Sequence, residues 1–295
     1  MGDLYNIRDE DIFTYRGTFF NSYSSLEALD ETCNFNFLPT DIIVSTFPRS
    51  GTTFTQEIVW QIKNCKNVLK GEKVERMLDR FPFIEHNHKM HPEIKISLCD
   101  LLDSQRTNPY RLIKTHVPYE FIKDNVEKVN SKFIVTMRNA KDCLVSNYQF
   151  FKHKKCHSYH GTFDEFFLTF VNGKSISGSY FDNNTEWWKL RARDNVLILF
   201  YEDLVKDPEE SVKKVANFLG DTLSDDDLDK VVHNVSFSTM SNNPKLNFQM
   251  KDNFTYLRKG VVGDWKNYLS EEQNKILDRK IEEKFQKVGL EFIYE

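Results

Sequence analysis

Short, mainly apolar runs alternate along the chain with longer segments in which apolar residues recur every three or four positions. The runs lie within the segments 42–46, 111–115, 133–137 and 196–200. Short apolar runs bounded by polar residues are typical of strands that are buried on both faces, as in a parallel sheet. We therefore expect four strands of a buried sheet at these positions.

The longer segments carry start signals for helices. Pro208 is followed by two glutamates, Ser224 is followed by three aspartates, and Ser270 stands three residues before Gln273 in the spacing of a capping box. Helices are expected at 52–64, 140–152, 164–172, 209–219, from 224 to about 233, and at 271–287. The alternation of strands and helices predicts a parallel sheet covered by helices on both faces. The least regular stretches are 66–110, 153–163 and 235–264, and long loops of this kind usually cover sites.

Composition narrows the class of protein. The 295 residues suffice for one large α/β domain or two small ones. A net charge of −4 gives no general attraction to nucleic acid or to an anionic membrane, so neither is expected as a partner. The five cysteines are widely spaced without a C-x-x-C pair, and the acidic N-terminus lacks the apolar core of a signal peptide. Since no apolar run approaches the ~18 residues of a membrane span, a reduced, cytoplasmic protein is expected.

Residues 46–53, TFPRSGTT, form a small-residue turn between the first expected strand and the first expected helix. Gly51 lets the backbone bend where a side chain would clash. The amides of such a loop and the dipole of the following helix point to one place, which favours an anion such as a phosphate. The loop is not a Walker A motif, because no glycine stands five residues before Gly51 and no lysine follows it. An ordinary strand-to-helix turn is the alternative interpretation of this loop taken alone.

Three further polar segments stand at strand ends or near the C-terminus. They are RLIKTHVP at 111–118, FIVTMRNAKDCLVSNY at 133–148 and LRKGVVGDWKN at 257–267. The first carries Lys114 and His116 at its strand end, and the second carries Arg138 after its strand and Ser146 in the following helix. The carboxyl ends of parallel strands meet at one edge, the usual ligand crevice of open α/β folds. We expect the polar segments to meet there.

These four motifs, in this order, resemble the cytosolic sulfotransferases. The resemblance continues through weaker landmarks, which are PF at 82–83, EWW at 186–188, FYEDL at 200–204 and NNP at 242–244. It implies an α/β, P-loop-like three-layer fold with a central, mostly parallel sheet flanked by helices, as a single domain over residues 1–295. It also implies in-line transfer of a sulfuryl group from 3′-phosphoadenylyl sulfate (PAPS) to a hydroxyl of a small lipophilic phenol, sterol or alcohol. The product nucleotide is adenosine 3′,5′-bisphosphate (PAP).

The resemblance also implies roles for residues of these motifs. His116 would be the general base, and Lys114 and Arg49 would stabilise the negative charge that develops on the transferring group and the leaving oxygen. The implied cofactor-binding residues are Arg49, Ser50, Gly51, Thr52, Thr53, Phe54, Arg138, Ser146, Tyr201, Ser236, Phe237, Leu257, Arg258, Lys259 and Gly260. The acceptor would contact Phe83, Lys114, His116 and Phe150, under a lid formed by 235–256.

No metal is required by this scheme, because cationic side chains and amides can stabilise the charge that magnesium stabilises elsewhere. Two histidine clusters are candidate metal ligands. They are HNHKMH at 86–91 and HKKCHSYH at 153–160. Neither has the frame of a zinc site, so both are expected to be solvated loop residues.

Three positions depart from the pattern of the family. Arg49 stands where the family usually has lysine, Phe54 where it has tryptophan, and Val235 where it has threonine. These departures leave a second function open, a PAPS-binding protein with weak or no transferase activity. A P-loop-like kinase would depend on ATP and magnesium, and the missing Walker lysine argues against it. A homodimer also stays open, although the usual dimer motif is not recognisable in 245–256.

Overall fold

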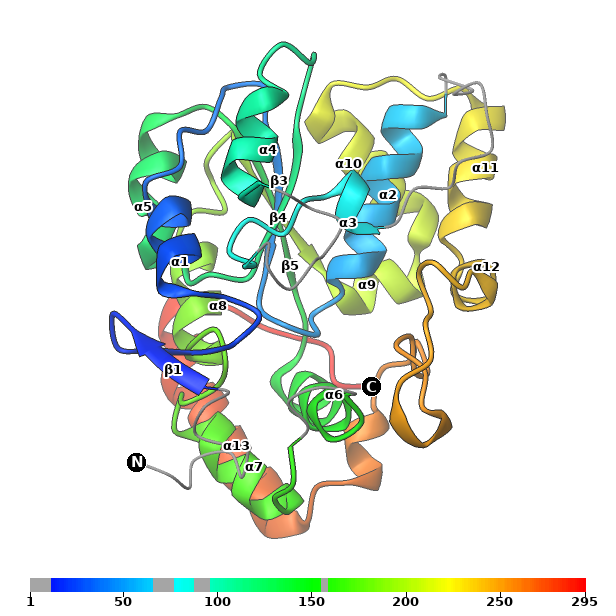
Figure 1. Ribbon diagram of the computed structural model, residues 1–295. Coiled ribbons are helices and arrows are strands. Elements are labelled where there is room, and N and C mark those ends of the chain that lie inside the picture. The colour runs from blue at the N-terminus through cyan, green and yellow to red at the C-terminus, as the bar shows by residue number, and fades with distance from the viewer. Residues whose placement is uncertain (1–11, 66–76, 88–95, 155–158) are drawn as a thin grey trace.

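The computed structural model describes residues 12–65, 77–87, 96–154 and 159–295. Its centre is a parallel sheet with the strand order β4-β3-β5-β6 (Figure 1). The strands are β3 (Ile42–Thr46), β4 (Leu112–Thr115), β5 (Lys132–Met137) and β6 (Val196–Phe200). The four predicted strands are therefore confirmed, with ends that differ from the prediction by at most one residue.

Six helices stand where start signals and apolar periodicity predicted them. They are α2 (Thr52–Asn64), α6 (Ala140–Lys152), α7 (Phe163–Val171), α10 (Pro208–Leu219), α11 (Asp225–Val235) and α13 (Glu271–Phe285). The predicted capping box at Ser270 and Gln273 is present, and Ser224 caps α11. Asp207 caps α10, whose first residue is Pro208.

Several short elements were not predicted. They are β1 (Ile12–Tyr15), β2 (Thr18–Asn21), α1 (Leu26–Cys33), α3 (Met77–Arg80), α4 (Leu98–Ser104), α5 (Tyr119–Lys128), α8 (Tyr180–Lys189), α9 (Tyr201–Lys206), α12 (Phe237–Asn242), η3 (Lys251–Asn253), η4 (Asp264–Asn267) and η5 (Gln286–Val288). α3 and α4 lie within 66–110, and α12 lies within 235–264, so the expectation of irregular structure was wrong there. These helices are too short for a recognisable apolar period, and α4 and α12 begin at serine caps, Ser97 and Ser236.

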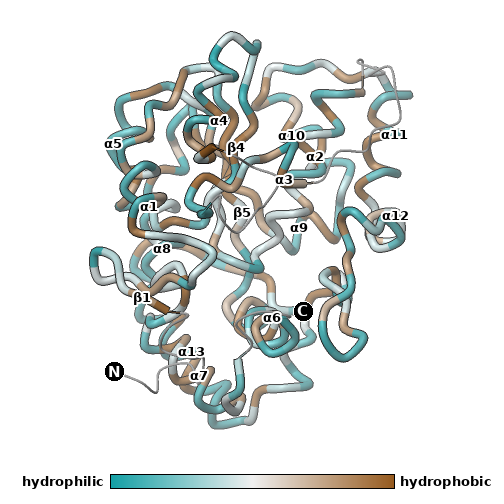
Figure 2. The backbone as a smooth tube through the Cα atoms, viewed as in Figure 1, coloured by the Kyte–Doolittle hydropathy of each residue, from teal (hydrophilic) through white to brown (hydrophobic). Residues whose placement is uncertain are grey.

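Both faces of the sheet are buried, which confirms the three-layer α/β architecture. Ile43 and Phe133 pack into one core, together with side chains of α1, α5, α6, α8 and α13. Ile42 and Val44 pack into the other, with side chains of α2, α10 and α11. Figure 1 shows these two helical layers on either side of the strands, and Figure 2 shows hydrophobic stretches along the strands and hydrophilic ones on outer loops. Among the described helices, none is both long and apolar enough to cross a membrane.

The sheet topology places a crevice between β3 and β5. These strands are neighbours, and Thr46 at the end of β3 pairs with Thr136 on β5. The chain leaves β3 into α2 on one face of the sheet and leaves β5 into α6 on the other face. In open parallel sheets, ligands bind where the connections of adjacent strands diverge in this way.

Candidate functional site

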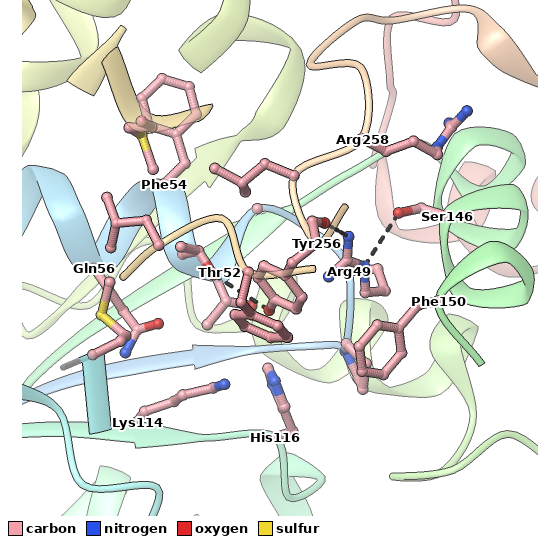
Figure 3. A pocket seen from close by; sticks show the side chains of 18 of the residues that line it. Arg49, Thr52, Phe54, Gln56, Lys114, His116, Ser146, Phe150, Tyr256 and Arg258 are labelled. Carbon is pink, nitrogen blue, oxygen red and sulfur yellow. Dashed lines mark hydrogen bonds between the residues drawn. The ribbon is translucent and has the colours of Figure 1, made fainter. Parts of the chain in front are cut away.

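A cavity of about 1150 Å³ lies at this carboxyl edge of the sheet (Figure 3). Eighteen of the residues predicted from the sequence line it together. They are Arg49, Gly51, Thr52, Thr53, Phe54, Phe83, Lys114, His116, Arg138, Ser146, Phe150, Tyr201, Ser236, Phe237, Leu257, Arg258, Lys259 and Gly260. They include residues from each of the four motifs at 46–53, 111–118, 133–148 and 257–267, so the fold brings these segments to one place.

Ser50 is the predicted residue that does not line the cavity. Its side chain is fully buried, and its Oγ lies 3.6 Å from the Sγ of Cys143 on α6. Its backbone N–H donates to the carbonyl oxygen of Phe47, 3.2 Å away, which closes the turn after β3. Ser50 therefore anchors the loop to α6.

The predicted need for glycine at position 51 is confirmed by the backbone. Gly51 has φ +108°, which side-chain-bearing residues rarely adopt. A Cβ atom there would lie 2.8 Å from Cδ2 of Tyr201. Gly51 is followed by the first turn of α2, whose backbone N–H groups have no partner within the helix. The turn thus presents free donors and the positive end of a helix to the cavity.

Arg49 bridges two of the motifs. Its Nε donates to Oγ of Ser146 on α6 (3.3 Å), and its Nη2 donates to the carbonyl oxygen of Tyr256 (2.9 Å; Figure 3). The guanidinium lies over the rings of Tyr256 and Phe150, 4.5 and 5.0 Å from their centroids. Burial lowers the pKa of Arg49 from its usual value, which is high enough that the group stays a cation.

Arg138 supplies a second cation with spare hydrogen-bonding capacity. Its Nη1 donates to the carbonyl oxygen of Arg49 (3.4 Å), its Nη2 donates to that of Val261 (3.3 Å), and it lies 4.2 Å from the ring centroid of Tyr201. Its Nε is buried without a hydrogen-bond partner. An unpaired donor on a buried cation lowers the stability of the fold unless an anion accepts its hydrogen bond. This side of the cavity therefore fits a phosphate.

The basic loop at 257–260 closes the same side of the cavity. Arg258 and Lys259 both pair with Asp264, and the Lys259 Nζ to Asp264 Oδ1 distance is 2.6 Å. These hydrogen bonds lower the pKa of Asp264 to about 2 against the opposing effect of its burial. Gly260 has φ +67°, and a Cβ there would lie 2.3 Å from Cδ2 of Phe237. The loop backbone therefore packs directly on that ring.

His116 has a defined hydrogen-bonding state. Its Nδ1 lies 2.7 Å from the carbonyl oxygen of Thr46, and a carbonyl oxygen only accepts. We therefore assign the proton to Nδ1, which leaves Nε2 with a lone pair. Burial lowers the pKa of His116 well below its usual value, and the nearby Lys114 lowers it further. The ring is thus neutral near pH 7, the form that can accept a proton.

Lys114 stands two residues before His116 on β4. Its Nζ lies 4.0 Å from the ring centroid of Phe83, and burial lowers its pKa from the usual value. The ring of Phe83 also meets the imidazole of His116 edge-on, with centroids 4.9 Å apart. Phe83 therefore packs against both polar groups of this strand end.

Glu85 is a buried carboxyl group that the sequence did not single out. One of its oxygens accepts the backbone N–H of His116 at 2.5 Å, whereas its Oε2 is buried without a partner. Burial raises the pKa of Glu85 to about 7. Among the lining residues of the described chain it is the one acidic side chain.

This raised pKa predicts a pH dependence of stability. Between the unfolded value near 4.5 and about 7, the unfolded state loses the proton of Glu85 before the folded state does. The free energy of unfolding therefore falls as pH rises through this window, by on the order of 1–3 kcal/mol for this group. Glu85→Gln keeps an acceptor for the His116 amide and is expected to flatten the decline. Urea unfolding at about pH 5 and about pH 8 measures it, and an equal decline in both proteins would contradict the assignment.

Further residues that line the cavity were not predicted from the sequence. Tyr256 precedes the basic loop, stacks on Phe248 with centroids 4.7 Å apart, and accepts a hydrogen bond from Thr53 Oγ1 at 3.4 Å. Gln56 is fully buried on α2. The position of Tyr256 beside the LRKG segment was the available signal, whereas nothing in the sequence distinguishes Gln56 from a surface glutamine.

The expectation that the histidine clusters are solvated was wrong for two of their members. His86 lines the cavity, and its ring lies over Phe83 with centroids 3.7 Å apart. His153 stacks on Phe254 at 4.3 Å, and its Nδ1 lies 2.8 Å from the carbonyl oxygen of Gln149. His160 is exposed, as expected, whereas the histidines at 88, 91 and 157, like the cysteine at 156, lie outside the described residues. Within the described ranges no three histidine, cysteine or acidic side chains are grouped so as to hold a metal.

Comparison with known proteins gives a consistent result. A family model described as the sulfotransferase domain matches residues 39–289. Sulfotransferase 1C2 of Oryctolagus cuniculus is 36% identical over 271 residues, which cover 89% of this chain and 88% of that protein. Sulfotransferase 1B1 of Mus musculus is 36% identical over 265 residues, which cover 88% of this chain and 87% of that protein.

Solved structures resemble the fold over most of its length. Mouse sulfotransferase SULT7A1 complexed with PAP is 30% identical, has a TM-score of 0.77, and covers 93% of this chain and 94% of its own. Retinol dehydratase in complex with androsterone and the inactive cofactor PAP is 25% identical, has a TM-score of 0.83, and covers 95% of this chain and 90% of its own.

Proposed function

The chain belongs to the sulfotransferase family, as a PAPS-dependent enzyme that acts on hydroxyl groups of small molecules, and from this premise we propose its acceptor class and its catalytic base. The acceptor is a small lipophilic phenol, sterol or alcohol, and His116 is the general base. The observation that carries this proposal is the imidazole of His116, whose Nδ1 is held by the Thr46 carbonyl while Nε2 keeps its lone pair. The enzyme forms one domain over residues 1–295 and works in the cytoplasm, where cysteine thiols stay reduced.

The anionic co-substrate fits the cationic half of the cavity. PAPS supplies an activated sulfuryl group on a phosphate oxygen. The first turn of α2 and Arg49 would hold the phosphosulfate end, and Arg138, Ser146 and the basic loop would hold the 3′-phosphate. The unpaired Nε of Arg138 is the feature of this chain that supports the assignment. Phe54, Phe237 and Leu257 would enclose the adenine.

The reaction needs a base on one side of sulfur and positive charge on the other. His116 Nε2 takes the proton of the acceptor hydroxyl as its oxygen forms a bond to sulfur, while the bond from sulfur to the phosphate oxygen breaks. Lys114 and Arg49 stabilise the negative charge that develops on the sulfuryl oxygens and the leaving oxygen. Apolar side chains that line the same cavity as His116 support a lipophilic acceptor. They are Phe20, Phe83, Phe150, Phe151, Phe248 and Met250.

Transfer of labelled sulfate from PAPS to a panel of phenols, sterols and alkanols tests the proposal, with PAP binding measured in parallel. Transfer to at least one class is expected. Tight PAP binding without transfer to any acceptor would favour the alternative, a PAPS-binding protein with weak or no transferase activity. One observation favours that alternative, because the Arg49 guanidinium is already engaged with Ser146 and Tyr256.

Lys114→Met is expected to shift the pH dependence of the reaction. Lys114 lowers the pKa of His116, so removing its charge raises the pH below which the base becomes protonated. The acidic limb of kcat/KM should therefore move to higher pH, in addition to a lower plateau. Lys154→Met is the matched control, since Lys154 lines the cavity but is not among the causes of the His116 shift. An unmoved acidic limb in Lys114→Met would argue against His116 as the titrating base.

A further inference from the structure

Gln56 is an unsatisfied polar side chain in the wall of the cavity. It is fully buried, it lines the cavity, and neither its Nε2 nor its Oε1 has a hydrogen-bond partner. A buried amide whose donor and acceptor are both unpaired is costly, and such groups are rare in folded proteins. The mechanism proposed above gives Gln56 no role.

The position of Gln56 on α2 determines which part of the cavity it faces. Gln56 follows Thr52 by four residues, so both lie on one face of the helix. Thr52 Oγ1 lies 2.6 Å from Thr46 Oγ1, the side chain next to the imidazole of His116. Phe54, two residues from each, is turned by about 200° to the opposite face. Figure 3 shows Phe54 remote from Lys114 and His116, with Gln56 on the side of Lys114.

The neighbouring segment completes this corner of the cavity. Arg80 at the end of α3 pairs with Glu57, the residue after Gln56, with Nη1 and Oε2 2.9 Å apart. The chain then continues to Phe83, which forms a β-bridge with Lys114. Gln56 therefore faces a corner between α2, α3 and β4, whose other lining residues include Met77, Leu78 and Phe81. The lining side chains that α3 and the following residue contribute to this corner, Met77, Leu78 and Phe81, are apolar.

We propose that Gln56 is a specificity-determining residue whose amide binds a second hydroxyl or similar hydrogen-bonding group of the acceptor, remote from the hydroxyl that is sulfated. The inference rests on the proposed function, since it names the chemistry of the acceptor. A hydroxyl both donates and accepts, so one such group can satisfy the Oε1 and the Nε2 of Gln56. The preferred acceptor is then a lipophilic molecule with two polar ends.

Equilibrium binding to the PAP complex tests this without requiring turnover. Calorimetry compares congener pairs that differ by one hydroxyl, namely α,ω-alkanediols with 1-alkanols of equal length, and steroid diols with the corresponding mono-ols. The wild-type complex is expected to bind the dihydroxy member of at least one pair about tenfold more tightly than the monohydroxy member. This factor is counted after correction for the statistical factor of two that arises when the two ends of a diol are equivalent. In Gln56→Leu the preference should vanish or reverse, because the second hydroxyl would be buried without a partner.

Two controls separate this role from others. Gln61→Leu changes a glutamine of the same helix that lies outside the cavity and donates to Glu57 at 2.6 Å, and it should keep the preference. The melting temperature of ligand-free Gln56→Leu should not fall, since an unpaired amide is replaced by an apolar group of similar size. A fall of several degrees would mean that the amide is satisfied internally, and would overturn the proposal.

The remaining outcomes are equally decisive. A wild-type complex that binds both members of every pair equally, or neither, overturns the proposal, as does a preference that survives in Gln56→Leu. Weaker PAP binding in Gln56→Leu with an unchanged pair ratio would assign the residue to the nucleotide instead. Failure of the proposed function is distinguishable, because it would abolish labelled transfer in the wild type while leaving the pair preference intact.

Discussion

His116→Ala is expected to lower kcat for sulfuryl transfer by roughly 10²–10⁴-fold, the usual contribution of a positioned general base. The physical reason is the loss of Nε2, which keeps a lone pair because the Thr46 carbonyl oxygen holds the Nδ1 proton at 2.7 Å. PAP affinity should change little, because the cations proposed to hold the nucleotide are elsewhere. Steady-state kinetics with PAPS and the best acceptor of the panel, together with calorimetry for PAP, measure both quantities.

His86→Ala is the matched control for this change. His86 lines the same cavity, and its ring lies over that of Phe83, which the ring of His116 meets edge-on. It does not share the Thr46 hydrogen bond, so its loss should alter acceptor binding rather than the proton transfer. An equal fall in kcat in both variants would show that lost packing on Phe83, and not lost base catalysis, explains the result.

Gly51→Ala is expected to weaken PAP binding by about 100-fold or more and to destabilise the protein. An alanine at φ +108° costs about 1–2 kcal/mol from backbone strain alone. The added Cβ would also lie 2.8 Å from the ring of Tyr201, which itself lies against Arg138. The loop must therefore shift, and with it the N–H groups aimed at the anion. Calorimetry with PAP and thermal unfolding measure the two effects.

Gly220→Ala separates strain from the clash. Gly220 ends α10 with φ +77°, and a Cβ there would meet nothing within 4 Å. This variant should lose a similar backbone free energy, by thermal unfolding, and retain full PAP affinity. PAP affinity in Gly51→Ala that stays within a few-fold of the wild-type value would show that the loop does not hold the anion.

The buried framework was predictable because local and tertiary preferences agree there. β3 and β6 are apolar runs with polar ends, and α13 carries its own capping box at Ser270. The N-terminal hairpin β1–β2 and α8 were missed, since strands of four residues and short aromatic-rich helices take their stability from packing against distant segments. Their sequences alone carry no period long enough to recognise.

The residues of the candidate site also divide into those that the sequence predicts and those that it does not. Charged residues and glycines at strand ends can be recognised in the sequence, because few residue types fit a tight anion-binding loop. Gly51 is one of these residues. Ser50 could not be separated from its neighbours, because its orientation toward Cys143 depends on how α6 packs. Gln56 and Glu85 could not be predicted from the sequence, because only the surrounding fold buries them. Orphaned polar atoms are properties of three-dimensional packing, which a linear pattern does not record.

Asp264 has a consequence for how an anion first encounters the protein. Because this carboxylate pairs with both Arg258 and Lys259, the three groups together present one net positive charge to an approaching nucleotide, not two. Long-range electrostatic acceleration of association grows with net charge and fades with ionic strength. Capture of the nucleotide by this loop should therefore be slower at low salt, and less sensitive to added salt, than capture by two uncompensated cations.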